Sequence, residues 1–244
     1  MVDLEVVVPA YNEAARIGPT LSRLKEYFGA KPYTWRVTVV SDGSTDGTNQ
    51  IVKEFVLANP EFALIDSQPN RGKGFVVRKG MLAAQAKHVL FSDADLAAPI
   101  EEIEKLLPMM AEFPIAIGSR PLKDSKLEVR QPLYREMLGR ASNKLIQLLG
   151  VRGIQDTQCG FKLFRNDVAH DVFGRCKLNG FSFDFEALMV ARDLGYEIAE
   201  VPIRWAHQEG SKVVLWRDAP KALFDLVKLR LMGKDKRTSP NIAP

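Results

Sequence analysis

The sequence predicts an α/β fold whose central sheet is mainly parallel and flanked by helices. Short apolar runs rich in β-branched residues recur along the chain, as expected for strands buried on both faces. In the first half, each run is followed by a segment whose apolar residues repeat at helical spacing. Such alternation favours a doubly wound, Rossmann-like sheet, because parallel neighbours need crossover connections.

The first half of the chain alternates regularly between the two patterns. The run at residues 4–9 is Leu-Glu-Val-Val-Val-Pro, and apolar residues then recur with a helical period over residues 17–28. A second β-branched run at residues 36–40 precedes a helical segment at 48–59. The same order continues with strands at 62–65, 88–91 and 115–118 and helices at 74–86 and 100–110.

The second half is less regular and contains amphipathic helices. Residues 133–149 are predicted to form a helix with an apolar stripe and basic residues between. The remaining predictions are strands at 161–164 and 198–203 and helices at 183–194 and 219–232. Beyond the last helix we expect a frayed end.

The composition is that of an ordinary globular protein. Of its 244 residues, 46% are apolar and 26% are charged. No stretch approaches about eighteen consecutive apolar residues, and the N-terminus has no basic segment, so neither a membrane-spanning helix nor a signal peptide is expected. Cys159 and Cys176 form neither a metal-spaced pair nor a disulfide framework, which favours a cytoplasmic compartment.

Two carboxylates follow the strand at residues 88–91, in the segment Ser92-Asp93-Ala94-Asp95. Because ligands of open α/β sheets bind beyond the carboxyl ends of the strands, both side chains are expected at a ligand site. Hard oxygen donors suit Mg²⁺ or Mn²⁺, which takes further ligands from water and a diphosphate. The alternative is an acidic turn in which Asp95 caps the next helix.

Two other loops are expected at the same edge. In Ser41-Asp42-Gly43-Ser44, the carboxylate can accept hydrogen bonds from a base or ribose, and Gly43 allows close approach of the backbone; Tyr11, after the first strand, can stack on a planar ring. The alternative for the second loop is a polar turn in which Asp46 caps a helix.

A third loop, Asn70-Arg71-Gly72-Lys73-Gly74, resembles a phosphate-binding loop before a helix N-terminus. Lys73 is not followed by Ser or Thr, and the spacing of the glycines differs from that of P-loop nucleotidases. We therefore exclude an ordinary P-loop enzyme.

Taken in order, Pro-Ala-Tyr-Asn-Glu at residues 9–13 and the three segments at 41–44, 70–74 and 93–95 resemble family 2 glycosyltransferases of GT-A fold. In the second half, three segments resemble the dolichyl-phosphate glucosyltransferase branch: residues 153–164, 183–186 (Phe-Asp-Phe-Glu) and 210–212 (Gly-Ser-Lys). The resemblance implies inverting transfer of a hexose, with UDP-glucose the favoured nucleotide sugar, to a polyprenyl phosphate. We expect a GT-A catalytic domain over residues 1–218 and a basic amphipathic helix and tail over 219–244.

The resemblance implies roles for single residues. Asp93 and Asp95 would bind the metal ion and, with Arg120 and Asp156, form the catalytic set. Family members often have a third metal ligand, Gln, two residues past the second Asp; Ala97 stands there, so water would complete the shell. The expected donor-binding residues are Pro9, Tyr11, Glu13, Asp42, Gly43, Lys73, Asp93 and Lys212, and the acceptor-binding residues are Ser119, Arg120, Arg135 and Arg140.

The acceptor decides whether a base is needed. A phosphate monoester has a second pKa of about 6 and is already an anionic nucleophile at neutral pH, whereas an alcohol needs a general base. Asp156 is the best candidate for such a base or for a carboxylate that orients the acceptor; the alternative is a cap or a partner of a neighbouring arginine.

Several alternatives stay open within and beyond this class. The donor could be GDP-mannose, or the acceptor a soluble molecule. A protein of a different class would be an inactive nucleotide-sugar-binding module, against which the intact Asp93/Asp95 pair, Lys212 and Arg120 weigh. Nucleic-acid binding is not expected, because no aromatic-basic recognition motif accompanies the basic C-terminal segment.

Two amphipathic segments favour peripheral contact with the cytoplasmic face of a membrane. They cover residues 130–152 and 219–232, and residues 217–237 hold seven basic and three acidic side chains, an excess equal to the net charge of +4 of the whole chain. Basic amphipathic helices can rest on an anionic bilayer surface. The alternative is packing of the apolar face in the core. Trp205 and Trp216 are interfacial anchors in the first case and core residues in the second.

Overall fold

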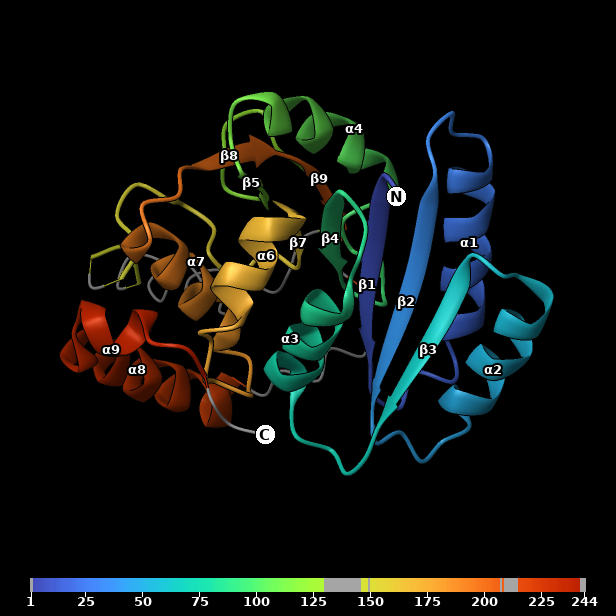
Figure 1. The fold of residues 1–244 in the computed structure, drawn as a ribbon, viewed down its shortest axis with the longest axis horizontal. Helices are drawn as coiled ribbons and strands as arrows, with labels where there is room; N and C mark the ends of the chain where they lie inside the picture. Colours follow the sequence, from blue (N-terminus) through green and yellow to red (C-terminus); the bar gives the residue numbers. More distant parts are fainter. Residues whose placement is uncertain (1, 130–145, 149, 207, 209–214, 242–244) are drawn as a thin grey trace.

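The computed structural model describes residues 2–129, 146–148, 150–206, 208 and 215–241. Within them, a seven-stranded sheet has the order β3-β2-β1-β4-β7-β5-β8 (Figure 1). Its first part is built from four parallel strands: β1 (Leu4–Ala10), β2 (Trp35–Asp42), β3 (Phe62–Ser67) and β4 (His88–Ser92). The α/β class and the mainly parallel sheet are confirmed.

The other strands complete the sheet around one reversed strand. β7 (Phe161–Arg165) is antiparallel to both β4 and β5 (Ile115–Ser119), and β5 is parallel to β8 (Ile198–Pro202). The ends of the other six strands and the start of β7 therefore lie at the same edge of the sheet. A separate pair of strands, β6 (Lys126–Val129) and β9 (Arg204–Ala206), was not predicted.

Helices cover both faces of the sheet (Figure 1). The core on one face includes buried residues of α1 (Ile17–Gly29), α2 (Thr48–Ala58) and α4 (Ile103–Leu106). The opposite core includes residues of α3 (Lys73–Ala83), α6 (Asn166–Phe173), α7 (Phe183–Asp193) and α8 (Leu215–Met232). Successive strand residues alternate between the two cores: Val7 belongs to one, and Val6 and Val8 to the other.

Two helix predictions differ from the structure. The expected helix at residues 100–110 is three short pieces, a 3₁₀ turn η1 (Ile100–Glu102), α4, and a second 3₁₀ segment η2 (Leu107–Ala111). Pro108 lies at the start of η2 and cannot donate an α-helical hydrogen bond, which ends α4. Helix α6 was missed, and most of the helix predicted at 133–149 lies outside the described residues.

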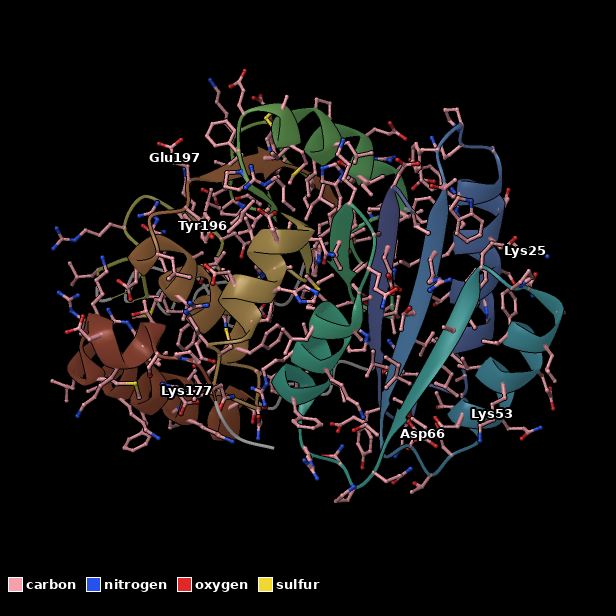
Figure 2. The ribbon with its side chains drawn as sticks, viewed as in Figure 1. Lys25, Lys53, Asp66, Lys177, Tyr196 and Glu197 are labelled. Carbon is pink, nitrogen blue, oxygen red and sulfur yellow. The ribbon has the colours of Figure 1, made fainter. Side chains whose placement is uncertain are left out.

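The frayed end expected after residue 232 is wrong, because helix α9 (Lys234–Thr238) packs against the domain. The buried Arg237 donates from Nε to Asp193 Oδ2 at 2.7 Å and from Nη1 to the carbonyl of Leu229 at 2.6 Å. Lys177, which lies beside α8 and α9 in Figure 2, donates to the carbonyl of Lys236. The domain boundary expected after residue 218 falls inside α8.

We predict that Arg237→Met lowers the free energy of unfolding by about 2–3 kcal/mol, because it leaves Asp193 and the Leu229 carbonyl without their cationic donor. Urea titration of the purified variant measures the loss. Lys236→Met is the matched control, since the Lys236 side chain is exposed, and should change stability by less than about 0.5 kcal/mol. Equal stability of both variants would mean that α9 does not anchor the C-terminus.

Candidate active site

The loops at the carboxyl edge of β1 and β2 are tied to each other by hydrogen bonds. The amide of Asn12 donates to Ser44 Oγ at 3.0 Å, and the amide of Glu13 donates to Thr48 Oγ1 at 2.8 Å. Asp46 accepts from the amide of Thr48 at 3.1 Å at the start of α2, which is the capping contact proposed as the alternative role of this turn. The two loops therefore form one structural unit.

The predicted donor-binding residues of the first loop lie at the end of β1. Pro9 is buried within the strand, opposite Val40 of β2. Tyr11 is 39% exposed beyond the end of the strand, as a ring that stacks on a planar ligand must be. Glu13 forms an ion pair with Arg16, with 2.6 Å between Oε2 and Nε, and its side chain is mostly buried.

Asp42, at the end of β2, holds the third loop in place. It is only 2% exposed, and its two carboxylate oxygens accept the amides of Arg71 and Gly72, each at 2.8 Å. Gly43 has a φ of +69°, and a Cβ there would lie 2.6 Å from the Asn70 nitrogen, so the position requires glycine. This contact between loops was not predicted from the sequence.

The third loop places Lys73 next to Asp93 and Asp95. Lys73 begins α3, and its Nζ lies 2.6 Å from Asp93 Oδ1. Burial opposes the charge of Lys73, but Asp93, Asp184 and Asp95 together raise its pKa above the ordinary lysine value. The ammonium is therefore a fixed cation at the end of β4.

Asp95 lies in a strained turn next to a like charge. Burial, and then the charge of Asp93, raise the pKa of Asp95. Its Oδ1 accepts the amide of Ala97 at 3.0 Å within the turn, whereas the next helical segment, η1, begins at Ile100 with Pro99 as its N-cap, so the capping alternative is wrong. Leu96 has a φ of +46°, a left-handed conformation that costs about 1–3 kcal/mol for a residue with a side chain and is found mainly at functional sites.

The two carboxylates fit a divalent cation that keeps other ligands. Within the described part of the chain, no group of three or more His, Cys, Asp and Glu side chains is placed to hold a metal. Asp93 and Asp95 would therefore supply only part of a coordination shell, as suits Mg²⁺ or Mn²⁺ bound with water and phosphate oxygens. Burial and then repulsion from Asp93 raise the pKa of Asp95, and a bound cation would relieve this repulsion.

The start of β7 packs directly against Asp93. The Gly160 carbonyl accepts the amide of Asp93 at 3.2 Å, and a Cβ on Gly160 would lie only 2.0 Å from Asp93 Oδ2. Behind it, the buried Lys162 donates from Nζ to the Cys159 carbonyl and to Asp184 Oδ1, each at 2.5 Å. Burial raises the pKa of Asp184 despite this partner.

The Lys162–Asp184 ion pair was not predicted from the sequence. A usable signal was present, because Lys162 interrupts the apolar run Phe161-Lys162-Leu163-Phe164 and Asp184 stands between Phe183 and Phe185. Charged residues inside such runs are almost never buried unless they are paired. Each of the two could have been predicted to need a partner of opposite charge.

Arg120 and Asp156 form a two-pronged ion pair at the end of β5. Arg120 Nε and Nη2 donate to Asp156 Oδ2 and Oδ1 at 2.6 and 2.8 Å, and the Arg120 amide donates to Oδ2 at 3.1 Å. Glu200 accepts the amide of Asp156 at 2.7 Å and fixes this segment. Burial of Asp156 is outweighed by the Arg120 charge, which lowers the carboxyl pKa, so Asp156 is a weak base and the arginine-partner alternative describes it.

The other predicted acceptor residues are placed differently. Ser119 is fully buried and, among the described residues, its Oγ has no hydrogen-bond partner, so it does not face solvent. Arg135, Arg140 and the predicted donor residue Lys212 lie outside the described residues.

A small hollow beside Asp93 is also lined by Trp205, the residue whose ring lies next to Arg120. Its walls include Asp93 on one side and Trp205 on the other, and the Arg120 guanidinium lies 5.5 Å from the centre of the Trp205 ring. The sheet edge thus places a cation and two carboxylates from the β3 and β4 loops beside a second cation from β5. The residues that line the hollow are Ser92, Asp93, Leu96, Ala97, Ala98, Cys159, Gly160 and Trp205.

This fold and edge define a glycosyltransferase of the GT-A type. The chain belongs to glycosyl transferase family 2, whose family model matches residues 5–173. It is 36% identical to the dolichyl-phosphate beta-glucosyltransferase of Saccharomyces cerevisiae, over 93% of this chain and 74% of that protein. It is 32% identical to the enzyme of the same name from Homo sapiens, over 93% of this chain and 75% of that protein. The family expected from the motifs is confirmed.

Solved structures support the same fold. Mannosyl-3-phosphoglycerate synthase from Rubrobacter xylanophilus aligns with a TM-score of 0.71 and 17% identity over all of this chain and 77% of that one. The mannosyltransferase PcManGT from Pyrobaculum calidifontis, solved with GDP-Man and Mn²⁺, aligns with a TM-score of 0.63 and 18% identity over 96% of this chain and 67% of that one. At these identities the likeness establishes the fold.

The ion pair at Asp156 predicts a pH-dependent stability. Because Arg120 lowers the folded pKa, the pair stabilises the protein above the ordinary Asp pKa of about 3.9, and this contribution is lost as pH falls through the lowered value. We expect Asp156→Asn to be less stable than wild type by about 1–3 kcal/mol at pH 7 and the difference to shrink below about pH 4. Urea titrations across pH measure it; a constant difference would contradict the assignment.

Proposed function

We propose that the chain transfers glucose from UDP-glucose to a dolichyl-type polyprenyl phosphate, with inversion at the anomeric carbon. The observation that supports the proposal is the placement, at one sheet edge, of the carboxylates of Asp93 and Asp95 next to Lys73 and of a separate cation, Arg120. The identity of 32–36% to dolichyl-phosphate beta-glucosyltransferases over most of both chains supports this donor and acceptor.

The donor would bind over the loops of β1 to β4. Tyr11 offers a ring to the base, and Lys73 a fixed cation to the diphosphate. Asp42 acts here through the loop it holds, with Gly43 allowing the close approach of the two loops. Asp93 and Asp95 would hold Mg²⁺ or Mn²⁺, which neutralises charge on the departing diphosphate.

The acceptor chemistry agrees with the charges at the end of β5. A lipid phosphate is already an anionic nucleophile, so it requires orientation by a cation rather than proton removal. Arg120 supplies that cation, 27% exposed and held in one orientation by Asp156. The lowered pKa of Asp156 makes it a positioning group in this scheme, not the base that a soluble alcohol acceptor would need.

We further propose that residues 1–218 form the catalytic part, with residues 219–244 as a helical extension, and that the protein works at the cytoplasmic face of a membrane. Among the described helices, none is both long and apolar enough to cross a bilayer. An acceptor whose polyprenyl tail lies in a bilayer supports action at its surface.

The test is a donor panel with purified protein, Mg²⁺ or Mn²⁺ and a short polyprenyl phosphate in detergent. Lipid-linked glucose formed from UDP-glucose is the expected product. If only GDP-mannose gives a lipid-linked product, the proposed sugar is wrong and the proposed acceptor is correct. Transfer only to soluble acceptors would contradict the proposed lipid phosphate acceptor. Tight donor binding without any transfer would indicate a nucleotide-sugar-binding module.

We predict that Asp95→Ala abolishes metal-dependent turnover and weakens Mn²⁺ binding by at least about tenfold, because one of two carboxylate ligands is lost. Electron paramagnetic resonance of free Mn²⁺ measures binding without turnover. Asp66→Ala is the control, since this exposed carboxylate lies near the same sheet edge, outside the aspartate pair (Figure 2). If Asp95→Ala binds Mn²⁺ as tightly as wild type, Asp95 is not a metal ligand.

For Arg120 we predict an effect confined to the acceptor. Arg120→Lys keeps a cation but loses the two-pronged contact with Asp156, so the KM for polyprenyl phosphate should rise about tenfold while the KM for the donor stays within about twofold. Steady-state kinetics with each substrate varied in turn give both values. An equal rise in both KM values would show that Arg120 does not act in acceptor binding alone.

A further inference from the structure

Helix α8 is apolar on two opposite faces. Its inner face contributes Leu226 and Leu229 to the core, where they are 1% and 2% exposed. With about 3.6 residues per turn, a second apolar row lies on the opposite side. We call this row the outer stripe; its residues are Leu223, Phe224, Val227 and Leu231, with exposures of 45%, 67%, 40% and 80%.

Basic side chains border the outer stripe. By helical geometry, the exposed Lys221 and Lys228 lie along one border and the exposed Arg230 along the other. Asp225, the acidic residue in this part of α8, is buried on the inner face. An exposed apolar row between cations is the arrangement of helices that lie in the surface of an anionic bilayer, where long basic side chains reach the headgroups.

The outer stripe is close to the proposed active site. The ammonium of Lys221 lies 3.5 Å from where a Cβ on Gly180 would be, and the ring of the next residue, Phe181, is centred 6.0 Å from Lys73 Nζ. In Figure 1, α8 lies at the end of the molecule toward which β1, β2 and β3 point. A surface bound along α8 would therefore lie beside the edge that holds the catalytic groups.

We propose that the outer stripe of α8 docks the protein on an anionic lipid bilayer. The inference rests on the proposed function, since it explains how an enzyme reaches a phosphate whose polyprenyl tail is embedded in lipid. A second copy of the chain is a poorer occupant, because a two-fold contact through this row would bring the same cations together.

The test is co-sedimentation with vesicles of phosphatidylcholine alone or mixed with phosphatidylglycerol. Wild type should bind the mixed vesicles more tightly, and less so as salt rises from about 0.1 M to about 0.5 M. The double variant Phe224→Ser/Leu231→Ser should bind at least about tenfold more weakly, because each exposed apolar side chain withdrawn from water contributes about that factor. Leu57→Ser is the matched control, since Leu57 is 88% exposed on α2, across the sheet from α8.

Two readouts separate this proposal from the proposed function. Turnover of a water-soluble, short-chain polyprenyl phosphate should be the same in the double variant and in wild type, while vesicle binding is lost. If the double variant binds vesicles as tightly as wild type, the outer stripe is not the docking surface. If, in addition, wild type is a dimer and the double variant a monomer, the outer stripe is a contact between two copies of the chain. Failure of every donor in the detergent assay would instead overturn the proposed function.

Discussion

The arrangement of the site depends on the hydrogen bonds that the carboxylate of Asp42 accepts. Its two hydrogen bonds to the amides of Arg71 and Gly72 fix the loop that begins α3, and this loop sets Lys73 against Asp93. Asp93 in turn packs on Gly160, whose neighbour Cys159 is held by Lys162. One series of contacts thus runs from β2 through β4 to β7, and each step places the next charge.

The charges of this series explain why the site suits a cation and a diphosphate. The carboxylates of Asp93, Asp95 and Asp184 face the ammonium groups of Lys73 and Lys162, so one negative charge is left over. Burial, and then the negative charge of Asp93, raise the pKa of Asp95, and the second of these causes belongs to this excess. A divalent ion would offset it, and the positive balance that results would attract phosphate oxygens.

Local patterns predicted most of the fold, and contacts between distant segments account for what they missed. The strands β1 to β4 and the helices between them carry clear apolar periods, and the loops after β1, β2 and β4 contained identifiable motifs. The reversed direction of β7, the docking of α9 through Arg237 and the loop-holding contact of Asp42 depend on partners far away in the chain. The spacing of apolar residues does not predict such distant partners. For Lys162, however, its charge within an apolar run indicated that it needed a partner of opposite charge.

The reversed strand β7 divides the sheet edge into two parts with separate supports. The loops of β1 to β4 are held by Asp42, Asp46 and Lys73. Arg120, after β5, is held by Asp156, whose amide donates to Glu200 of β8. Strand β7 joins the two parts, because it pairs with β4 on one side and with β5 on the other. Substitutions in the loops of one side therefore act first on the hydrogen bonds of that side, so sugar preference and acceptor preference can diverge separately in evolution or in engineering.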